Sequence, residues 1–238
     1  DCRHDLVHLR QGEIGAAEDQ APALVNPIYG STMAEARVNE LVFESLYTDD
    51  AELATTPALA ESSRIADDKL SMEVTLRSDV TWHDGQPFTA DDVVFTIKAM
   101  QDRASASTES GRVAWIADAV ALDARTVKLT FVRTEARPED KLFFKILPKH
   151  AFNGRPVRRS DTFRTRPVGT GPWRLALFNE DNSITFKKND GWRDAVGIDE
   201  VTLREVADKN YQAKLVLYES LEALVRVLPR DLALLQRA

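Results

Sequence analysis

The chain has 238 residues, of which 43% are hydrophobic and 29% charged, and its formal net charge is −7. This composition is typical of a folded globular protein with one large or two small domains, and it excludes a disordered chain. The acidic balance argues against a nucleic-acid partner, which would require clustered cations at high pI. The one basic stretch, residues 155–166, is interpreted as a solvated loop because Pro156 interrupts it and it has no aromatic ladder.

The N-terminal region carries few targeting signals. No stretch approaches the roughly 18 to 20 consecutive apolar residues that a membrane span requires, and the first five residues are too polar for a signal-peptide core. We expect that any export signal has been removed. Cys2 is the single cysteine, so an internal disulfide is impossible. Asp1 stands where a lipobox would have a small residue, and lipidation of Cys2 therefore stays open.

The first elements are expected in the following order. Residues 6–10 alternate in polarity and predict a strand, and residues 11–30 predict a long irregular loop. Long loops without regular structure tend to be functional, so this loop is a candidate cleft lining. Thr32 and Glu35 have the spacing of a capping box, and the apolar pattern behind them predicts a helix over residues 33–47.

Alternating patterns predict further strands at residues 72–76 and 127–131, after a connector over residues 50–57. Between these strands, Thr89 and Asp92 predict the start of a helix whose apolar face includes Val93, Ile97 and Met100. Residues 184–186 and 201–203 are strand-like, and residues 169–172 predict a turn. A helical stripe is expected at residues 211–218, and a strand and a helix start at residues 224–238.

The stretch from Val80 to Phe95 contains a recognisable motif, W-x-D-G-x-P-x-T-A-x-D-V. Its fixed positions here are Trp82, Asp84, Gly85, Pro87, Thr89, Ala90, Asp92 and Val93. This stretch resembles the signature of family 5 extracellular solute-binding proteins, the binding components of peptide, nickel and related ABC importers. Physically it predicts a strand, a tight turn at Asp84-Gly85 and a capped helix, with Trp82 in a core. The motif therefore identifies the family without marking a ligand site.

Later segments match the same family in order. Residues 57–62 resemble its L-A-E-S-W segment, with Ser63 in place of the tryptophan, and residues 148–150 resemble its P-K-H. Residues 168–173 resemble its V-G-T-G-P-Y, and residues 188–192 resemble its R-N-P-x-Y-W. The resemblance thus covers about residues 5 to 235.

The resemblance implies an α/β (α+β mixed) fold: a periplasmic-binding-protein type II-like first lobe with an inserted α+β domain, the opposite lobe being largely missing from the chain. We expect residues 1–48 plus 132–210 to form the discontinuous mixed domain of the first lobe. Residues 49–131 would form the inserted domain, and residues 211–238 the start of a truncated third domain.

The function that the resemblance implies is capture of oligopeptide-like ligands between two lobes and delivery to an ABC permease in the membrane. Nickel or haem complexes, opines and sugars stay open as ligands. We expect a monomer in the periplasm or on the outer face of the bacterial cytoplasmic membrane, with no cofactor, metal or nucleic acid. The predicted ligand contacts are Gln11, Gly12, Glu13, Ile14, Asn26 and Tyr29 in the loop, and Gly169, Thr170 and Trp173 in the turn.

Two other functional classes are alternatives for this chain. An enzyme would need a reactive constellation, and the chain offers neither a metal-binding histidine pair nor a nucleophile elbow. His83 and Asp84 could form an acid-base pair, but adjacent turn residues normally point apart, so we predict that the chain is not an enzyme. The second alternative is a single-lobe interaction or sensory module of the same fold without a transport role.

Overall fold

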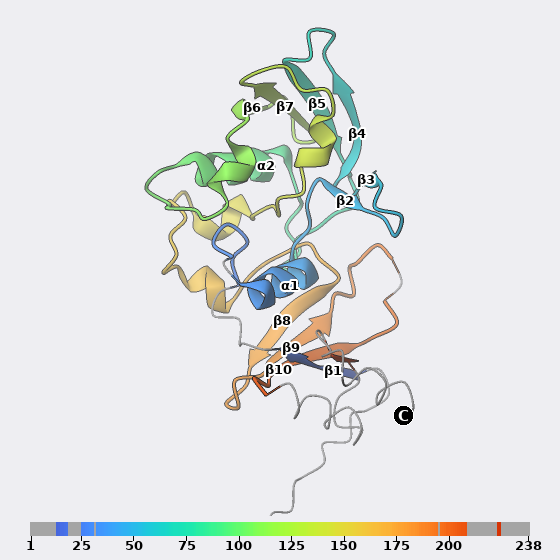
Figure 1. Cartoon of the computed structure of the whole chain (residues 1–238), viewed down its shortest axis with the longest axis vertical. Coiled ribbons are helices and arrows are strands. Elements are labelled where there is room, and N and C mark those ends of the chain that lie inside the picture. The colour runs from blue at the N-terminus through green and yellow to red at the C-terminus, as the bar shows by residue number, and fades with distance from the viewer. Residues whose placement is uncertain (1–12, 19–24, 31, 195, 209–222, 225–238) are drawn as a thin grey trace, which may run out of the picture. The chain divides into compact units, whose positions relative to one another are not determined.

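The computed structural model of the chain describes residues 13–18, 25–30, 32–194, 196–208 and 223–224, and it divides into two compact units (Figure 1). The larger unit takes Leu24–Pro172 and Gly191–Arg193, and the other unit takes the stretches before, between and after these. The elements predicted at residues 6–10, 211–218 and 225–238 lie outside the described residues. The three-part domain division given above stays a prediction.

One unit is a five-stranded mixed sheet with the order β11-β1-β10-β9-β8. The bounds of its strands are Glu13–Glu18 for β1, Trp173–Phe178 for β8, Ile184–Lys188 for β9, Glu200–Glu205 for β10 and Ala223–Leu224 for β11. The strands predicted at residues 184–186 and 201–203 are confirmed as β9 and β10, which pair antiparallel. The prediction of a loop is wrong for residues 13–18, which form strand β1. That segment pairs in parallel with β10, residue Glu13 opposite Glu200, and such a distant partner leaves no local signal.

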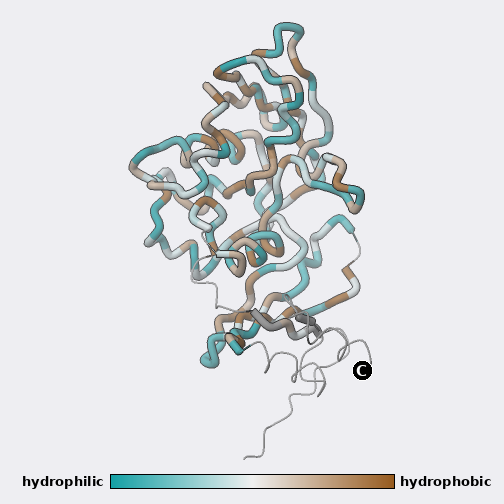
Figure 2. The backbone as a smooth tube through the Cα atoms, viewed as in Figure 1, coloured by the Kyte–Doolittle hydropathy of each residue, from teal (hydrophilic) through white to brown (hydrophobic). Residues whose placement is uncertain are grey.

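The other unit contains a four-stranded antiparallel sheet with the order β4-β5-β7-β6. Its strands are β4 (Ala60–Ile65), β5 (Ser71–Leu76), β6 (Ile116–Ala121) and β7 (Thr126–Phe131), and β5 and β7 confirm the predicted alternation. Apolar and polar residues alternate along β5 and β7, and their apolar positions are buried; Figure 2 shows that this part of the chain mixes hydrophobic and hydrophilic positions. Helix α2 (Ala90–Gln101) begins where predicted and packs against β6 and β7 with Val93, Ile97 and Met100 buried.

Short elements complete this unit. A hairpin is formed by β2 (Tyr47–Asp49) and β3 (Thr55–Pro57), so the connector predicted over residues 50–57 ends in a strand. Four 3-10 helices follow along the chain: η1 (Ser110–Val113), η2 (Pro138–Lys141), η3 (Lys149–Phe152) and η4 (Thr162–Thr165).

Helix α1 (Met33–Val42) begins at the predicted capping box and ends earlier than predicted. The Thr32 hydroxyl accepts a hydrogen bond from the Glu35 amide, and the Glu35 carboxylate accepts one from the Thr32 amide, both at 3.1 Å. The helix ends because Phe43 is extended and the chain turns into β2. The apolar residues at positions 43–47 that suggested a longer helix are buried in non-helical backbone, so their pattern reflects burial rather than helical periodicity.

The end of α1 is closed by a later loop. The amide of Gly171 donates to the carbonyl of Val42 at 2.9 Å, which satisfies one of the carbonyls that a helix end leaves without an intrahelical partner. The approach is very close: a Cβ atom on Gly169 would lie 1.8 Å from the Val42 oxygen. Glycine is therefore required here by contact with the helix backbone.

This contact makes a stability prediction. Gly169→Ala should lower the free energy of unfolding by about 1–3 kcal/mol or more, because the new methyl group must displace helix backbone. Gly111→Ala is the matched control, since a Cβ there meets nothing within 4 Å, and its effect should stay within about 0.5 kcal/mol. Urea denaturation of both variants measures the difference, and equal midpoints would contradict the close packing.

Candidate functional site

A pocket of about 310 Å³ lies beside the N-terminal half of α1. Its walls come from three parts of the larger unit: the loop Pro27, Ile28 and Gly30, the exposed edge of α1 from Thr32 to Glu40, and residues 100–145. Apolar groups such as Ile28 and Met100 form part of the lining. Two ion pairs contribute charge of both signs, Glu40 with Lys145 at 2.5 Å and Glu109 with Arg112.

Asn39 is the polar residue of this pocket without an evident structural task. It lies on α1, is 5% exposed, and its Oδ1 atom has no hydrogen-bond partner among the described residues. Gly30 keeps the space next to it open, since a Cβ there would lie 3.4 Å from Asn39 Nδ2. A buried amide oxygen without a donor costs about 1–3 kcal/mol. Asn39 is therefore the pocket residue whose polar group folding leaves without a use, and its Oδ1 is buried in this structure.

The two predicted contacts on the adjoining loop are buried, and their polar groups hold the loop in place. Asn26 is 2% exposed and its Oδ1 accepts from the Ile28 amide at 3.2 Å. The hydroxyl of Tyr29 lies 2.7 Å from the Ser105 carbonyl oxygen and 3.1 Å from that of Val157. Burial raises the pKa of the Tyr29 phenol, which keeps its proton available for donation. Their neighbours Pro27, Ile28 and Gly30 line the pocket instead.

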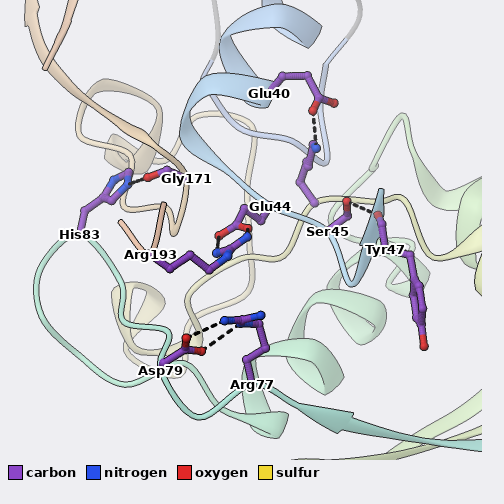
Figure 3. A network of polar contacts seen from close by, with 10 residues as sticks. Glu40, Glu44, Ser45, Tyr47, Arg77, Asp79, His83, Gly171 and Arg193 are labelled. Carbon is purple, nitrogen blue, oxygen red and sulfur yellow. Dashed lines mark hydrogen bonds and ion pairs between the residues drawn. The ribbon is translucent and has the colours of Figure 1, made fainter. Parts of the chain in front are cut away.

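The predicted contacts Gly169 and Thr170 belong to a structural network with His83 and Glu44, and Figure 3 shows His83 beside Gly171 and Glu44 beside Arg193. The Gly169 amide donates to Nδ1 of His83 at 3.2 Å, so the His83 Nε2–H faces the Gly171 carbonyl at 3.0 Å. Thr170 is 3% exposed and bonds the carboxylate of Glu44. Both loop residues therefore fix the end of α1. His83 thus serves to hold the loop at residues 169–171 in place.

Other predicted residues lie elsewhere. Trp173 begins β8 in the other unit, and its indole Nε1 is buried without a hydrogen-bond partner among the described residues. Glu13 and Ile14 lie in β1, while Gln11 and Gly12 lie outside the described residues. The His83–Asp84 pair considered for catalysis does not form, because Asp84 bonds His150 at 2.8 Å while His83 bonds the 169–171 loop.

The sequence analysis missed Asn39. A signal was present, because Asn39 follows Glu35 by four positions and both fall on the buried side of α1 with Val38 and Val42. A polar side chain at a core position of an amphipathic helix needs a partner. Glu35 has one in the capping box, whereas none was assigned to Asn39.

Glu44 and Arg193 form a buried ion pair across a large sequence separation. The guanidinium donates to both carboxylate oxygens, with one contact at 3.2 Å, and its Cζ atom lies 4.0 Å from the ring centre of Trp192. Burial raises the pKa of Glu44, while Arg193, Thr170 and Lys145 act in the opposite direction. The pair ties residues 191–193 to the larger unit.

Two features are absent from the part of the chain that the structure describes. Among those residues, no helix is long and apolar enough to cross a membrane. Within the same ranges, no group of three or more His, Cys, Asp or Glu side chains is placed to hold a metal ion.

Comparison with known proteins shows what class of protein has this fold. The solved structure of NikZ from Campylobacter jejuni, in complex with Ni(L-His), matches with a TM-score of 0.83 at 26% identity over 91% of this chain and 43% of that chain. AppA from Bacillus subtilis, in complex with a nonapeptide, matches with a TM-score of 0.89 at 22% identity over 95% of this chain and 46% of that chain. The predicted type II periplasmic-binding-protein fold is therefore confirmed for a part of such a protein.

The sequence comparisons then give the family. The model of bacterial extracellular solute-binding proteins, family 5, matches residues 54–237, and the chain belongs to this family. The oligopeptide-binding protein AppA of Bacillus subtilis is 25% identical over 210 residues, which cover 84% of this chain and 38% of that protein. The glutathione-binding protein GsiB of Escherichia coli is 29% identical over 195 residues, 78% of this chain and 36% of that protein. The chain thus spans less than half the length of these relatives.

The family consists of extracellular binding proteins, in agreement with the prediction that the chain is not an enzyme.

The Glu44–Arg193 pair gives a testable pH dependence. Arg193→Met should destabilise the chain by about 3–5 kcal/mol at neutral pH, because it leaves a buried carboxylate without its cation. Without Arg193 the folded-state pKa of Glu44 rises further above its ordinary 4.5, so the folded variant takes up a proton before the unfolded chain does. The loss of stability should therefore shrink as the pH falls from 7 toward 4.5.

The control is Arg64→Met, which breaks a surface pair between Arg64, 81% exposed, and Glu73. Its cost should be at most about 1 kcal/mol and should not depend on pH in this window. Chemical denaturation at a series of pH values separates the two variants. Equal costs, or a cost of Arg193→Met that grows on acidification, would contradict the assignment.

Proposed function

We propose that this chain is the ligand-capturing part of a solute-binding component of a bacterial ABC importer, and that its ligands are oligopeptide-like. The observation that carries the proposal is the pocket beside α1 with the unpaired amide oxygen of Asn39, in a chain of family 5. Related proteins are named for binding an oligopeptide, glutathione and Ni(L-His). These ligands all contain amino-acid units. The N–H groups of such units can donate to the unpaired Oδ1 of Asn39.

The pocket chemistry supports a peptide in physical terms. Peptide ligands of two-lobed proteins are held largely by hydrogen bonds to their main chain, with side chains in roomy pockets. A main-chain N–H directed at Asn39 Oδ1 would satisfy a group that is otherwise desolvated without compensation. The apolar lining by Ile28 and Met100 suits a small side chain.

The remaining parts of the proposal concern the whole protein. The contacts predicted from the sequence, at residues 11–14, 26, 29, 169, 170 and 173, stay predictions. Delivery would be to a permease in the membrane, from the periplasm or the outer membrane face, where a lipid on Cys2 could serve as an anchor. Closure over the ligand would require the opposite lobe.

The test is an NMR titration with trialanine, a peptide without charged side chains. We expect saturable shifts of the amide signals of Gly30 and Asn39. Asn39→Leu should weaken binding about ten-fold, the equivalent of one hydrogen bond to an otherwise unpaired group.

Gln86→Met is the matched control, because it removes an exposed side-chain amide outside the pocket lining. It should leave the affinity unchanged. The proposal fails if trialanine causes no saturable shift at the pocket, or if Asn39→Leu binds as well as the wild type.

A further inference from the structure

A second, larger hollow adjoins the pocket at Arg112 and Phe143, which line both. Its volume is about 640 Å³, and its walls come from η1, the end of β7 and η2. Both hollows belong to the larger unit, and the two shared residues place them next to each other.

The second hollow differs from the first in its charge. Arg112, Arg133 and Lys141 line it, against one carboxylate, Asp140. The cations are partly engaged: Arg112 pairs with Glu109, and Lys141 pairs with Glu135 at 2.5 Å.

Arg133 is the cation with the most unused hydrogen-bonding capacity. Its side chain is 80% exposed and makes a single long contact, 3.7 Å from Nε to Glu135. A guanidinium carries five N–H donors in a planar fork that matches a carboxylate. Glu109 and Glu135 offset the charges of Arg112 and Lys141, so attraction of an anion to this hollow comes mainly from Arg133.

An aromatic surface lies beside these cations. The Trp115 ring packs on Phe131 at 5.1 Å between centres, and Lys141 Nζ lies 5.2 Å from its centre. The Trp115 Nε1–H donates to the Arg112 carbonyl at 2.8 Å, which fixes the ring plane. Val132, 64% exposed, adds apolar surface next to it. The hollow thus offers a rigid apolar wall with cations above it.

From this arrangement we infer that the second hollow is a subsite for a carboxylate carried on an apolar or aromatic group, at one end of an extended ligand whose other part occupies the pocket at Asn39. Charge complementarity selects the carboxylate, and Trp115 and Val132 select its apolar carrier. The inference rests on the proposed function and makes it narrower: the ligand is elongated and anionic at the end near η2.

The test compares two small probes that differ in charge alone, N-acetyl-phenylalanine and its neutral amide. The readout is the indole N–H signal of Trp115 in NMR spectra of the whole chain, assigned through Trp115→Phe. We expect the carboxylate probe to shift this signal saturably and the amide probe to bind at least about five-fold more weakly.

Arg133→Gln should abolish this preference for the carboxylate. Arg64→Gln is the matched control, because Arg64 is 81% exposed, also pairs with a glutamate, and does not line the hollow. It should leave the preference intact. Arg133 is exposed, so its substitution should leave the fold intact. Unchanged NMR signals away from the hollow will verify that the variant is folded.

Three results would overturn the inference: no shift of the Trp115 signal, equal binding of the two probes, or the same loss with Arg64→Gln as with Arg133→Gln. The trialanine titration is read at Gly30 and Asn39. A failure of the proposed function and a failure of this subsite therefore appear at different signals.

Discussion

The buried carboxylate of Asp92 is the interaction on which much of the larger unit depends. Asp92 is 3% exposed, and its Oδ2 accepts from the Thr89 amide at 2.9 Å and from the Trp82 indole at 3.3 Å. Its Oδ1 accepts from the Lys149 amide at 2.8 Å. Burial raises the pKa of Asp92, and these donors oppose the rise. One side chain thereby joins the turn, the start of α2 and the start of η3.

The turn at residues 82–87 also contacts later segments that resemble the family, at residues 148–150 and 168–173. His83 bonds the loop at residues 169–171, and Asp84 bonds His150. The turn itself is tight, with Gly85 at φ +84° and its amide donating to the Trp82 carbonyl at 2.8 Å. Segments that resemble the family far apart in sequence are therefore in contact in space. This explains why the motif identifies the family so well and yet forms no part of the pocket.

Elements with a strong local pattern could be predicted from the sequence, and elements that depend on distant partners could not. Helix α2 and strands β5 and β7 carry their own periodicity and caps, and all three were predicted. Strand β1 was missed because the sequence EIGAAE has little strand propensity and is held by pairing with β10. The end of α1 depends on contact with Gly169 and Gly171, which follow it by more than a hundred residues.

The candidate site shows the same division at the level of single residues. Sequence reasoning found the loop before α1 but selected Asn26 and Tyr29, whose polar groups bond the Ile28 amide and the carbonyls of Ser105 and Val157. Polarity alone cannot tell a side chain that supports a loop from one that meets a ligand. The distinction needs a count of partners, which exists only in three dimensions.

Two polar residues on the buried face of helix α1 allow such a count of hydrogen-bond partners. Glu35 and Asn39 are four residues apart and both are buried, but their hydrogen bonds differ. The Glu35 carboxylate closes the capping box with Thr32, so its polar group is used by the fold. The Asn39 amide oxygen, one turn later and beside the pocket, has no such bond among the described residues. Folding alone thus explains the polar group at position 35, whereas the one at position 39 has no partner among the described residues, which is the reason for proposing a ligand there.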